Sequence, residues 1–537
     1  MEVLSLSKVK ERVIVFGEIY EIERWYHILK KDYPLKKCME DIMYYAYLKY
    51  GDDCFRKVRG AYSCLLQLKD EIRIYVPPFQ LVPLYYTKKD HEVYVSDSFF
   101  DLAKARNEKL IVNRKSLLEL FSFSPCMSQH QSVYKHMYAL ASGHVLIYTK
   151  NELRIEKWYH IPVYDHKDSY EESVQKIRKL LKESIEAQKE GVEASCLSGG
   201  LDSSIIVSNC ENIQTYSLDY EGNQEHFQAN RFQQSLDTPY IEEMCQKYDC
   251  DHHSYMISQE ELVDCLKDAL WAREVPGMVD IDASLYWFVK QIKKNHSIIF
   301  SGECADEVFG GYPWFHQKEY ENCESFPFLA YQKERLLLLR QEYRNLPFDA
   351  YMKDKYDQCL KDIVWKENKD EQRFQKMRHL TFDYFMQALI VRQYCMSKVH
   401  GVKIRVPFAD VSLMEYVYNL PVAYCHYGGK EKQILRDAFK DVLPSSIYHR
   451  KKNPFPKSYH PLFTELVCER LKDCLKEDSV LLEIFDKEAL EALIASKGQS
   501  YTFPWFGQLM SGPSLLAYIY TFHVWLSDER IQLDLSC

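Results

Sequence analysis

The 537-residue chain has no run of about 18 apolar residues, the length that a membrane-spanning helix needs. Its start, Met1 to Trp25, alternates charged and apolar residues, without the apolar segment or small-residue cleavage site of a secretory signal. It also lacks an excess of basic charge: 69 Lys+Arg against 78 Asp+Glu leave a net charge of −9. General nucleic-acid binding needs a basic surface. We therefore expect a cytoplasmic protein that binds neither membrane nor nucleic acid.

The 17 cysteines lack the spacing of a zinc knuckle. The tightest group is Cys245, Cys250, His252 and His253, which reads better as a helix end followed by a loop and a strand. Without a secretion signal, the thiols are expected to stay reduced. Composition is otherwise that of an ordinary globular protein, with 46% hydrophobic and 27% charged residues.

The first unit, placed at residues 1–162, has the pattern of a strand-rich α+β domain. Helical spacing at 38–50 and 114–121 interrupts a series of short β-type segments. These are Arg12–Ile19, Ala61–Leu68, Glu71–Val76, Glu92–Ser96, Gly143–Tyr148 and Leu153–Trp158. A polar, proline-containing stretch at 161–169 is the expected linker.

The second unit, placed at residues 170–537, begins with an amphipathic helix at Tyr170–Gln188, whose apolar residues recur at spacings of three and four. Strand and helix patterns then alternate to about residue 300, and the rest is mostly helical. Alternation of this kind predicts a parallel sheet with helices on its faces. The expected fold class is α/β: an N-terminal α+β sandwich, then a doubly wound parallel-sheet domain with a helical C-terminal part.

A glycine-rich turn follows the strand that ends at Leu197. It reads SGGLDSS, residues 198–204. Glycines let the backbone approach a ligand closely, and the free N–H groups of a helix start attract anions. Asp202 would repel a phosphate unless a cation lay between them, which predicts Mg²⁺. No G-K-[ST] follows, so this is not a P-loop. The turn resembles the loop of the ATP-pyrophosphatases, which cleave ATP between its α and β phosphates.

A second strand ends in another Ser-Gly turn, Ser301-Gly302, and acidic residues follow it. Glu303 and Asp306 leave the carboxyl end of this strand, where the ligand crevice of an open α/β sheet lies. Asp306 is therefore expected to complete a Mg²⁺ site with Asp202, and Glu303 to accept a proton. Taken alone, the motif could equally be a solvated acidic loop.

Together, SGGLDSS and SGECADEVFGGY resemble the motifs of asparagine synthetase. Three later segments extend the resemblance: GVKIRVPF at Gly401–Phe408, GKEKQIL at Gly429–Leu435 and RKKNPFPKSYHP at Arg450–Pro461. It covers essentially the whole chain and is strongest between residues 190 and 460. It implies an N-terminal domain of glutamine amidotransferase class II (Ntn-hydrolase) type and a synthetase domain of ATP-pyrophosphatase type.

The resemblance also implies a reaction. In the family, a carboxylate, that of aspartate, attacks the α-phosphate of ATP–Mg²⁺, pyrophosphate leaves, and ammonia converts the acyl-adenylate into an amide and AMP. Asp202 and Asp306 would hold Mg²⁺, Lys432 would contact the phosphates, and Glu303 would accept a proton. The other expected nucleotide contacts are Ser198, Gly199, Gly200, Ser203, Ser204, Ser301, Gly302 and, at the end of the strand Gln214–Leu218, Leu218.

The N-terminal unit departs from the family where glutaminase chemistry resides. The family's cysteine nucleophile follows the initiator Met, where this chain has Glu2. Phe16 stands where the family has the Asn that stabilises the oxyanion, and Met39 where it has the Asp that binds the glutamine amine. We expect an N-terminally truncated, folded but inactive glutaminase domain.

Two departures in the synthetase half leave the substrate open. Asp282 lies near a position where some members have arginine, and Gln393-Tyr394-Cys395 replaces a charged K-D-R. The leading hypothesis is a ligase acting on aspartate, because Glu303 distinguishes the chain from β-lactam-forming relatives, which have Tyr at that position. Alternatives are a peptide-cyclising or natural-product enzyme, an ATP-pyrophosphatase acting on tRNA, and a non-catalytic binding subunit. ATP and Mg²⁺ are the expected cofactors, with small molecules as partners and a homodimer left open.

Overall fold

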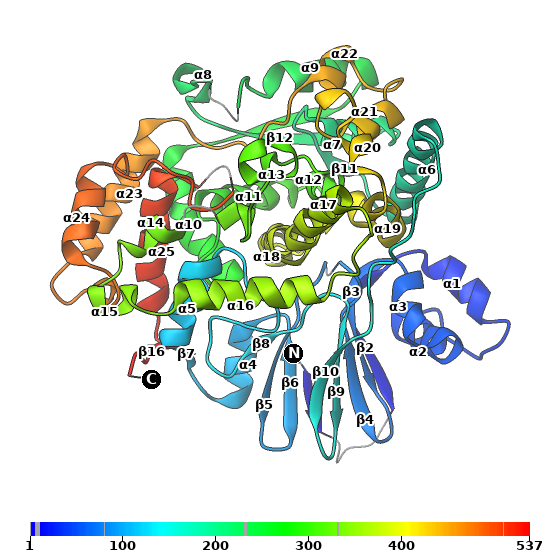
Figure 1. Cartoon of the computed structure of the whole chain (residues 1–537), viewed down its shortest axis with the longest axis horizontal. Helices are drawn as coiled ribbons and strands as arrows, with labels where there is room; N and C mark the ends of the chain where they lie inside the picture. Colours follow the sequence, from blue (N-terminus) through cyan, green and yellow to red (C-terminus); the bar gives the residue numbers. More distant parts are fainter. Residues whose placement is uncertain are drawn as a thin grey trace.

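The computed structural model describes residues 2–5, 11–79, 81–229, 233–329, 332–507 and 510–536. Two antiparallel sheets form its N-terminal part, at the bottom of Figure 1. One has the order β1–β6–β5–β8 (Glu2–Ser5, Glu92–Ser96, Tyr85–Lys89, Tyr138–Ala139). The other has the order β10–β9–β4–β3–β2 (Leu153–Lys157, His144–Thr149, Glu71–Tyr75, Gly60–Gln67, Arg12–Ile19).

Alternating side chains bury both faces of the larger sheet. Leu65 of β3 and Ile74 of β4 belong to an apolar cluster shared with Val93 and Val95 of the other sheet, so the two sheets form a sandwich. Their neighbours, such as Leu66, point away from the sandwich and pack under helices. The helices of this part are α1 (Ile22–Leu29), α2 (Met39–Tyr50), α3 (Cys54–Lys57), α4 (Phe99–Arg106) and α5 (Arg114–Phe123).

The second part is built on a five-stranded parallel sheet with the order β13–β12–β11–β14–β15. Its strands are His252–Ile257, Gln214–Tyr220, Ala194–Cys196, Ile298–Phe300 and Lys403–Arg405. From β11 the chain builds outwards to β13, then returns to add β14 on the other side. The direction of winding therefore reverses between β11 and β14, and a doubly wound sheet binds its ligand at such a reversal.

Helices surround this sheet in Figure 1. Around the strands lie α6 (Tyr170–Gln188), α7 (Leu201–Ser208), α8 (Asn223–His226), α9 (Thr238–Tyr248), α10 (Gln259–Arg273), α11 (Asp280–Ile292), α12 (Ala305–Phe309) and α13 (Pro313–His316). The helical remainder includes α16 (Phe348–Lys361), α17 (Lys369–Leu380), the π-helix η4 (Thr381–Met386), α18 (Gln387–Lys398), α19 (Val411–Tyr418), α21 (Gln433–Ala438), α22 (Ser445–His449), α23 (Pro461–Cys474), α24 (Lys487–Ala495) and α25 (Gly512–Leu526). At its start, α6 has a reciprocal capping box between Ser169 and Glu172.

Ion pairs, a strand pairing and a shared apolar core join the two parts. Glu18 at the end of β2 pairs with Lys403 at 2.8 Å and with Arg405 at 3.0 Å, both on β15. Strand β16 (Ile531–Leu533), near the C-terminus, pairs in parallel with β7 (Leu110–Val112). Apolar residues of α4 and α5 also belong to the large core of the second part.

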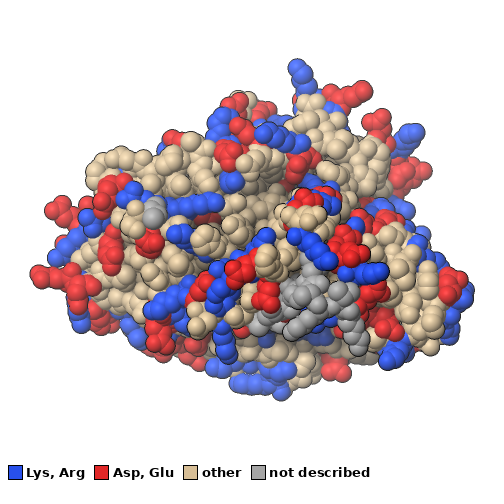
Figure 2. Space-filling model, turned by 90° about the horizontal axis from the view of Figure 1, so that it is seen from below, with Lys and Arg blue, Asp and Glu red and all other residues tan. Residues whose placement is uncertain are grey.

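Basic and acidic side chains are interspersed over the described part of the face seen from below in Figure 2. No helix in the described part of the chain is both long and apolar enough to cross a membrane.

Candidate active site

The two motifs lie side by side at the carboxyl edge of the parallel sheet. Strand β11 pairs with β14 through Ala194 and Ile299, and each strand ends in a Ser-Gly turn that leads into a helix. The turn after β11 enters α7, which carries Asp202, and the turn after β14 enters α12, which carries Asp306. The winding reversal therefore brings together carboxylates that are far apart in the sequence.

The first turn is shaped by its own hydroxyls and by glycine. The Ser198 backbone N–H donates to Ser203 Oγ at 3.1 Å, which closes the turn over the start of α7. Gly199 has φ +63°, and a Cβ there would lie 2.6 Å from the Cβ of Tyr240. Only glycine fits this position, because a side chain would meet both backbone strain and α9.

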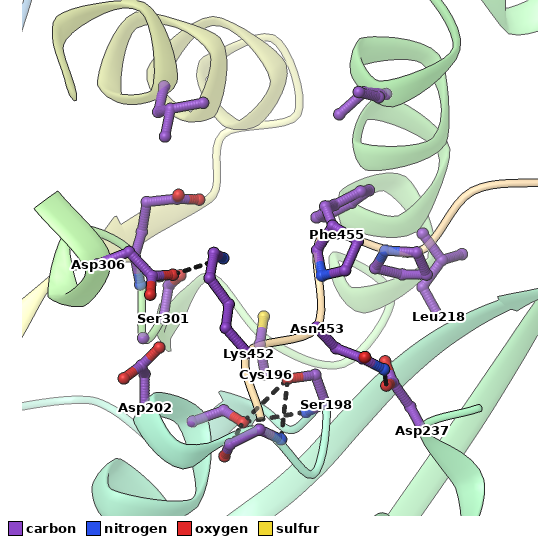
Figure 3. A pocket seen from close by; sticks show the side chains of 18 of the residues that line it. Cys196, Ser198, Asp202, Leu218, Asp237, Ser301, Asp306, Lys452, Asn453 and Phe455 are labelled. Carbon is purple, nitrogen blue, oxygen red and sulfur yellow. Dashed lines mark hydrogen bonds and ion pairs between the residues drawn. The ribbon is translucent and has the colours of Figure 1, made fainter. Parts of the chain in front are cut away.

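Lys432 lies at the centre of the site. Its Nζ donates to both carboxylate oxygens of Asp202, at 2.8 and 2.7 Å, and lies 2.7 Å from Asp306 Oδ1. The Lys432 side chain is only 2% exposed. Lys452 donates to Asp306 Oδ2 at 2.7 Å. Figure 3 marks this interaction with a dashed line. Two lysines and two aspartates thus form one charge cluster.

Burial and pairing act in opposite directions on these groups. Burial opposes the charge of Asp306, but Lys432 and Lys452 outweigh it and hold the pKa of Asp306 below its usual range. Burial likewise opposes the charge of Lys432, yet the two aspartates raise its pKa. Burial raises the pKa of Asp202, and Lys432 offsets only part of that effect.

The aspartate pair fits Mg²⁺. Both carboxylates touch one cationic nitrogen at 2.7–2.8 Å, so a cation placed between them would reach both. Mg²⁺ commonly takes one or two protein carboxylates and completes its shell with substrate phosphates and waters. The hydroxyls and N–H groups of the Ser198–Ser203 turn lie next to Asp202, at the start of α7.

Glu303 and Glu307 follow Gly302 but have different surroundings. Glu303 accepts from Arg392 at 2.8 Å and lines the same cavity as Lys432. Glu307 is buried and accepts from the Tyr312 hydroxyl at 2.6 Å. Burial, reinforced by the charges of Asp306 and Glu303, raises the pKa of Glu307 to about 8. These surroundings therefore favour the protonated form of Glu307.

The cavity has a volume of about 270 Å³, close to the lower end of the roughly 300–1,000 Å³ typical of ligand sites. The charge cluster forms one end, and Leu218 and Phe455 lie across from it in Figure 3. Behind the Ser198 turn, Asp237 accepts from Arg450 at 2.5 Å and from Asn453 at 3.0 Å. The cavity thus joins a polar, charged end to an apolar end.

Most of the residues predicted from the sequence meet in this cavity. They are Ser198, Gly200, Asp202, Ser203, Leu218, Ser301, Gly302, Glu303, Asp306 and Lys432. Gly199 and Ser204 are not among the lining residues: Gly199 packs on Tyr240, and Ser204 is fully buried in α7. Asp282 does not line the cavity either, because it is buried 3.7 Å from Arg273 and accepts from the Met278 N–H.

Five cationic residues that line the cavity were not predicted from the sequence: Arg392, Arg436, Arg450, Lys451 and Lys452. Arg450 and Lys452 both lie in the segment RKKNPFPK, which contributed to the resemblance without a role for either residue. Three consecutive basic residues beside a proline-rich loop were the available signal. Arg392 stands directly before Gln393, in a helix with no comparable local pattern.

The fold and site define an ATP-dependent synthetase built on a doubly wound sheet, with an amidotransferase-type sandwich attached. Comparison with known families agrees: "Asparagine synthase" matches residues 176–527 and "Glutamine amidotransferase domain" matches residues 4–159. The chain belongs to the asparagine synthase family and is a carbon–nitrogen ligase of that type. The predicted resemblance, fold class and ligase class are thereby confirmed.

Three relatives illustrate the match. Asparagine synthetase [glutamine-hydrolyzing] 3 of Bacillus subtilis is 33% identical over 541 residues, covering 97% of this chain and 88% of that protein. Asparagine synthetase [glutamine-hydrolyzing] 1 of the same organism is 23% identical, with 83% and 75% covered. Asparagine synthetase B [glutamine-hydrolyzing] of Escherichia coli is 24% identical, with 56% and 48% covered.

Proposed function

We propose that this chain adenylates a small carboxylate, with the aspartate side chain as the leading candidate, and converts it into an amide with ammonia. The observation that carries the proposal is the convergence of Asp202 and Asp306 on Lys432 where β11 and β14 end. The polar end of the cavity suits a polyphosphate, and the apolar end suits adenine and the acceptor. The proposed division of labour assigns residues 1–162 to the amidotransferase-like unit and 170–537 to the synthetase.

The chain's own residues have distinct roles in this reaction. The acceptor carboxylate attacks the α-phosphorus, the bond to the bridging oxygen breaks, and pyrophosphate leaves with its electron pair. Lys432 and Lys452 place positive charge where the pyrophosphate gains negative charge. When ammonia attacks the acyl carbon, Glu303 accepts a proton and AMP departs. The apolar wall that includes Leu218 and Phe455 limits access of water to the acyl-adenylate.

Mg²⁺ is the cation we assign to Asp202 and Asp306. When bound, it would neutralise phosphate charge and so favour departure of pyrophosphate. The turn Ser198–Ser203 and the N–H groups at the start of α7 would orient the phosphates beside it. The carboxylate chemistry of the pair supports a hard cation with oxygen ligands.

We further propose that the amidotransferase-like unit does not hydrolyse glutamine. Phe16 packs against the apolar cluster between the two sheets, and Met39 packs against the cluster beneath the helices. Neither side chain can stabilise an oxyanion or bind an amine. Glu18 of the same strand as Phe16 is engaged by Lys403 and Arg405. In this proposal the unit is a scaffold for the synthetase.

Release of pyrophosphate tests the synthetase proposal. ATP, Mg²⁺ and ammonium are supplied with a panel of carboxylates that includes aspartate, glutamate and peptides. Aspartate-dependent release that Asp202→Asn or removal of Mg²⁺ abolishes would support it. The matched control Asp264→Asn alters a side chain that is 67% exposed on α10, and it should leave turnover unchanged. Release with peptides alone would favour the peptide-cyclising alternative, and release with tRNA alone would favour the tRNA-acting one. No release of pyrophosphate with any of these acceptors would favour the non-catalytic binding subunit.

Glutamine in place of ammonium tests the inactive amidotransferase unit separately. We expect no glutamate above background and no aspartate-dependent pyrophosphate release when glutamine is the only nitrogen source. Robust glutamate formation would contradict this part while leaving the synthetase proposal intact.

The described cysteines are free thiols, which supports a reducing compartment such as the cytosol.

A further inference from the structure

The π-helix η4 faces a second cavity, separate from the nucleotide site. Phe385 of η4 lines the nucleotide cavity, whereas Asp383 lines a cavity of about 40 Å³ between the two parts of the chain. Residues of both parts line this small cavity, among them Lys157 and His160 from the N-terminal side. Short π-helical turns inside helices often occur at functional sites.

Three metal-ligating side chains converge beside this cavity: Cys359 of α16, His379 of α17 and Asp383 of η4. Their ligand atoms all lie within 4.8 Å of one another, and no other such group of three occurs in the described ranges. The Cys359 thiol donates to Asp383 Oδ2 with Sγ and Oδ2 3.7 Å apart, and His379 Nε2 is 3.5 Å from the same oxygen.

The two separations from the carboxylate oxygen match the edges of a zinc tetrahedron. Zinc bonds of about 2.3 Å to sulfur, 2.0–2.1 Å to nitrogen and 2.0–2.2 Å to oxygen imply edges of about 3.3–3.7 Å. The carboxylate oxygen lies at this distance from both the sulfur and the nitrogen. Any adjustment needed to enclose an ion falls on the sulfur-to-nitrogen separation, which is within 4.8 Å. The nearest alternative, a hydrogen-bonded cluster, would place the imidazole nitrogen about 2.7–3.2 Å from its acceptor.

His379 supplies an independent sign that a partner is missing. The residue is only 7% exposed, and neither ring nitrogen has a hydrogen-bond partner in the structure. Nearby, Asp362 is already paired with Lys157 at 2.7 Å. An unpartnered buried imidazole therefore faces a thiol and a carboxylate.

We propose that Cys359, His379 and Asp383 form a zinc site that ties α16 to α17 and η4. The Cys359 thiol loses its proton to solvent on binding, so thiolate, neutral imidazole and carboxylate supply three ligands. Water completes the tetrahedron, since the adjoining 40 Å³ cavity exceeds the roughly 10–15 Å³ that one water needs. Soft thiolate with imidazole favours Zn²⁺ over Mg²⁺.

The site has a structural role in this proposal. The bound ion would fix the π-helical turn η4 on the side that faces the small cavity between the two parts of the chain. Phe385 of the same turn lines the nucleotide cavity. Bound zinc would hold these helices together and raise the resistance of the fold to heat. The proposal does not depend on which carboxylate the synthetase uses.

Metal content of the full-length protein tests the proposal. The chain is loaded with Zn²⁺, passed through a desalting column with a weak chelator, and analysed by mass spectrometry for bound metals. We expect one Zn²⁺ per chain, together with a lower melting temperature after a strong chelator removes it. With Co²⁺ in place of Zn²⁺, a thiolate-to-metal charge-transfer band should appear. A wild-type chain that retains less than a tenth of an equivalent would overturn the proposal.

Variants assign the ligands. Cys359→Ser and His379→Gln should each lower Zn²⁺ occupancy at least tenfold and remove the cobalt band, while Asp383→Asn should weaken binding. The matched control is Cys468→Ser, which alters another buried cysteine, in α23. Equal occupancy in Cys359→Ser and Cys468→Ser would mean that zinc binds elsewhere, and would refute the site.

Discussion

Replacing Lys432 by methionine separates the two tasks of the central cluster. Methionine keeps most of the length of the side chain and removes its charge. Among the described residues, no cation then lies at hydrogen-bond distance from Asp202, and Lys452 alone remains beside Asp306. Removing one partner of a buried ion pair costs about 3–5 kcal/mol of unfolding free energy. We expect a loss in that range, because Lys432 is 2% exposed and serves two carboxylates.

The double variant Lys432→Met/Asp202→Asn should recover much of this stability, because the carboxylate left without a partner becomes a neutral amide. It should not recover activity: pyrophosphate release should stay at least about 100-fold below the parent in both variants, as expected when a charge-stabilising group is lost. Urea unfolding followed by tryptophan fluorescence gives the first quantity, and a coupled pyrophosphate assay gives the second.

The matched control is Lys353→Met, which removes a lysine that is 74% exposed and paired with Asp357 on the same helix. Its effect should stay within about 0.5 kcal/mol. The reasoning would be refuted if Lys432→Met cost no more than this control, or if the double variant were less stable than the single one.

Three further outcomes follow from the structure. Glu307 has a pKa raised to about 8, against 4.5 ordinarily, so its stabilising contribution is full below pH 4.5 and is lost as pH rises to about 8. The unfolding free energy of Glu307→Gln minus that of the parent should therefore increase by up to a few kcal/mol from pH 5 to pH 8. An equal difference at both pH values in urea titrations would count against this reasoning. At Gly302 a Cβ would lie 2.8 Å from the backbone nitrogen of Ser203, so Gly302→Ala should displace the phosphate turn and lower kcat/KM about 100-fold while circular dichroism stays unchanged; parental kinetics would show that the turn tolerates the shift. Burial opposes the charge of Glu18, but Arg405 and Lys403 outweigh this effect and lower the pKa of Glu18. Its contribution to the unfolding free energy is therefore full above pH 4.5, and it is lost as the pH falls through the lowered pKa of the folded state. Glu18→Gln should cost about 1–3 kcal/mol at pH 7 and less at pH 4, and a larger loss at pH 4 would contradict the pairing.

The sequence predicted elements best where one face of an element is buried. Arg12–Ile19, Glu92–Ser96 and Tyr170–Gln188 have the predicted bounds. Alternating or helical apolar spacing is a local property, so such elements can be found without their partners. Strand β12 runs on to Tyr220 instead of ending at Leu218, because its last residues pair with β13. Pairing with a distant strand has no local signal.

The same limit applies to the site. Its two turns were found because each combines glycine, serine and acid at a strand end. Lys432 reads from its neighbours as an exposed lysine of a helix face, yet it precedes α21 with φ +55° and is buried against Asp202. Lys452 and Arg392 belong to segments that are distant in sequence and reach the cavity only in the folded chain. Three-dimensional convergence therefore supplied charged side chains of the site that no local pattern marks.

The pairing of β16 with β7 has a consequence for biosynthesis. Leu110–Val112 leaves the ribosome early, but Ile531–Leu533, its partner, is translated after almost all the rest of the chain. At about 5–20 residues per second, the early strand waits on the order of half a minute or more with an unpaired edge. An exposed strand edge invites pairing with other chains. A chaperone that covers residues 110–112 on the nascent chain would therefore protect this protein during synthesis more than after its release.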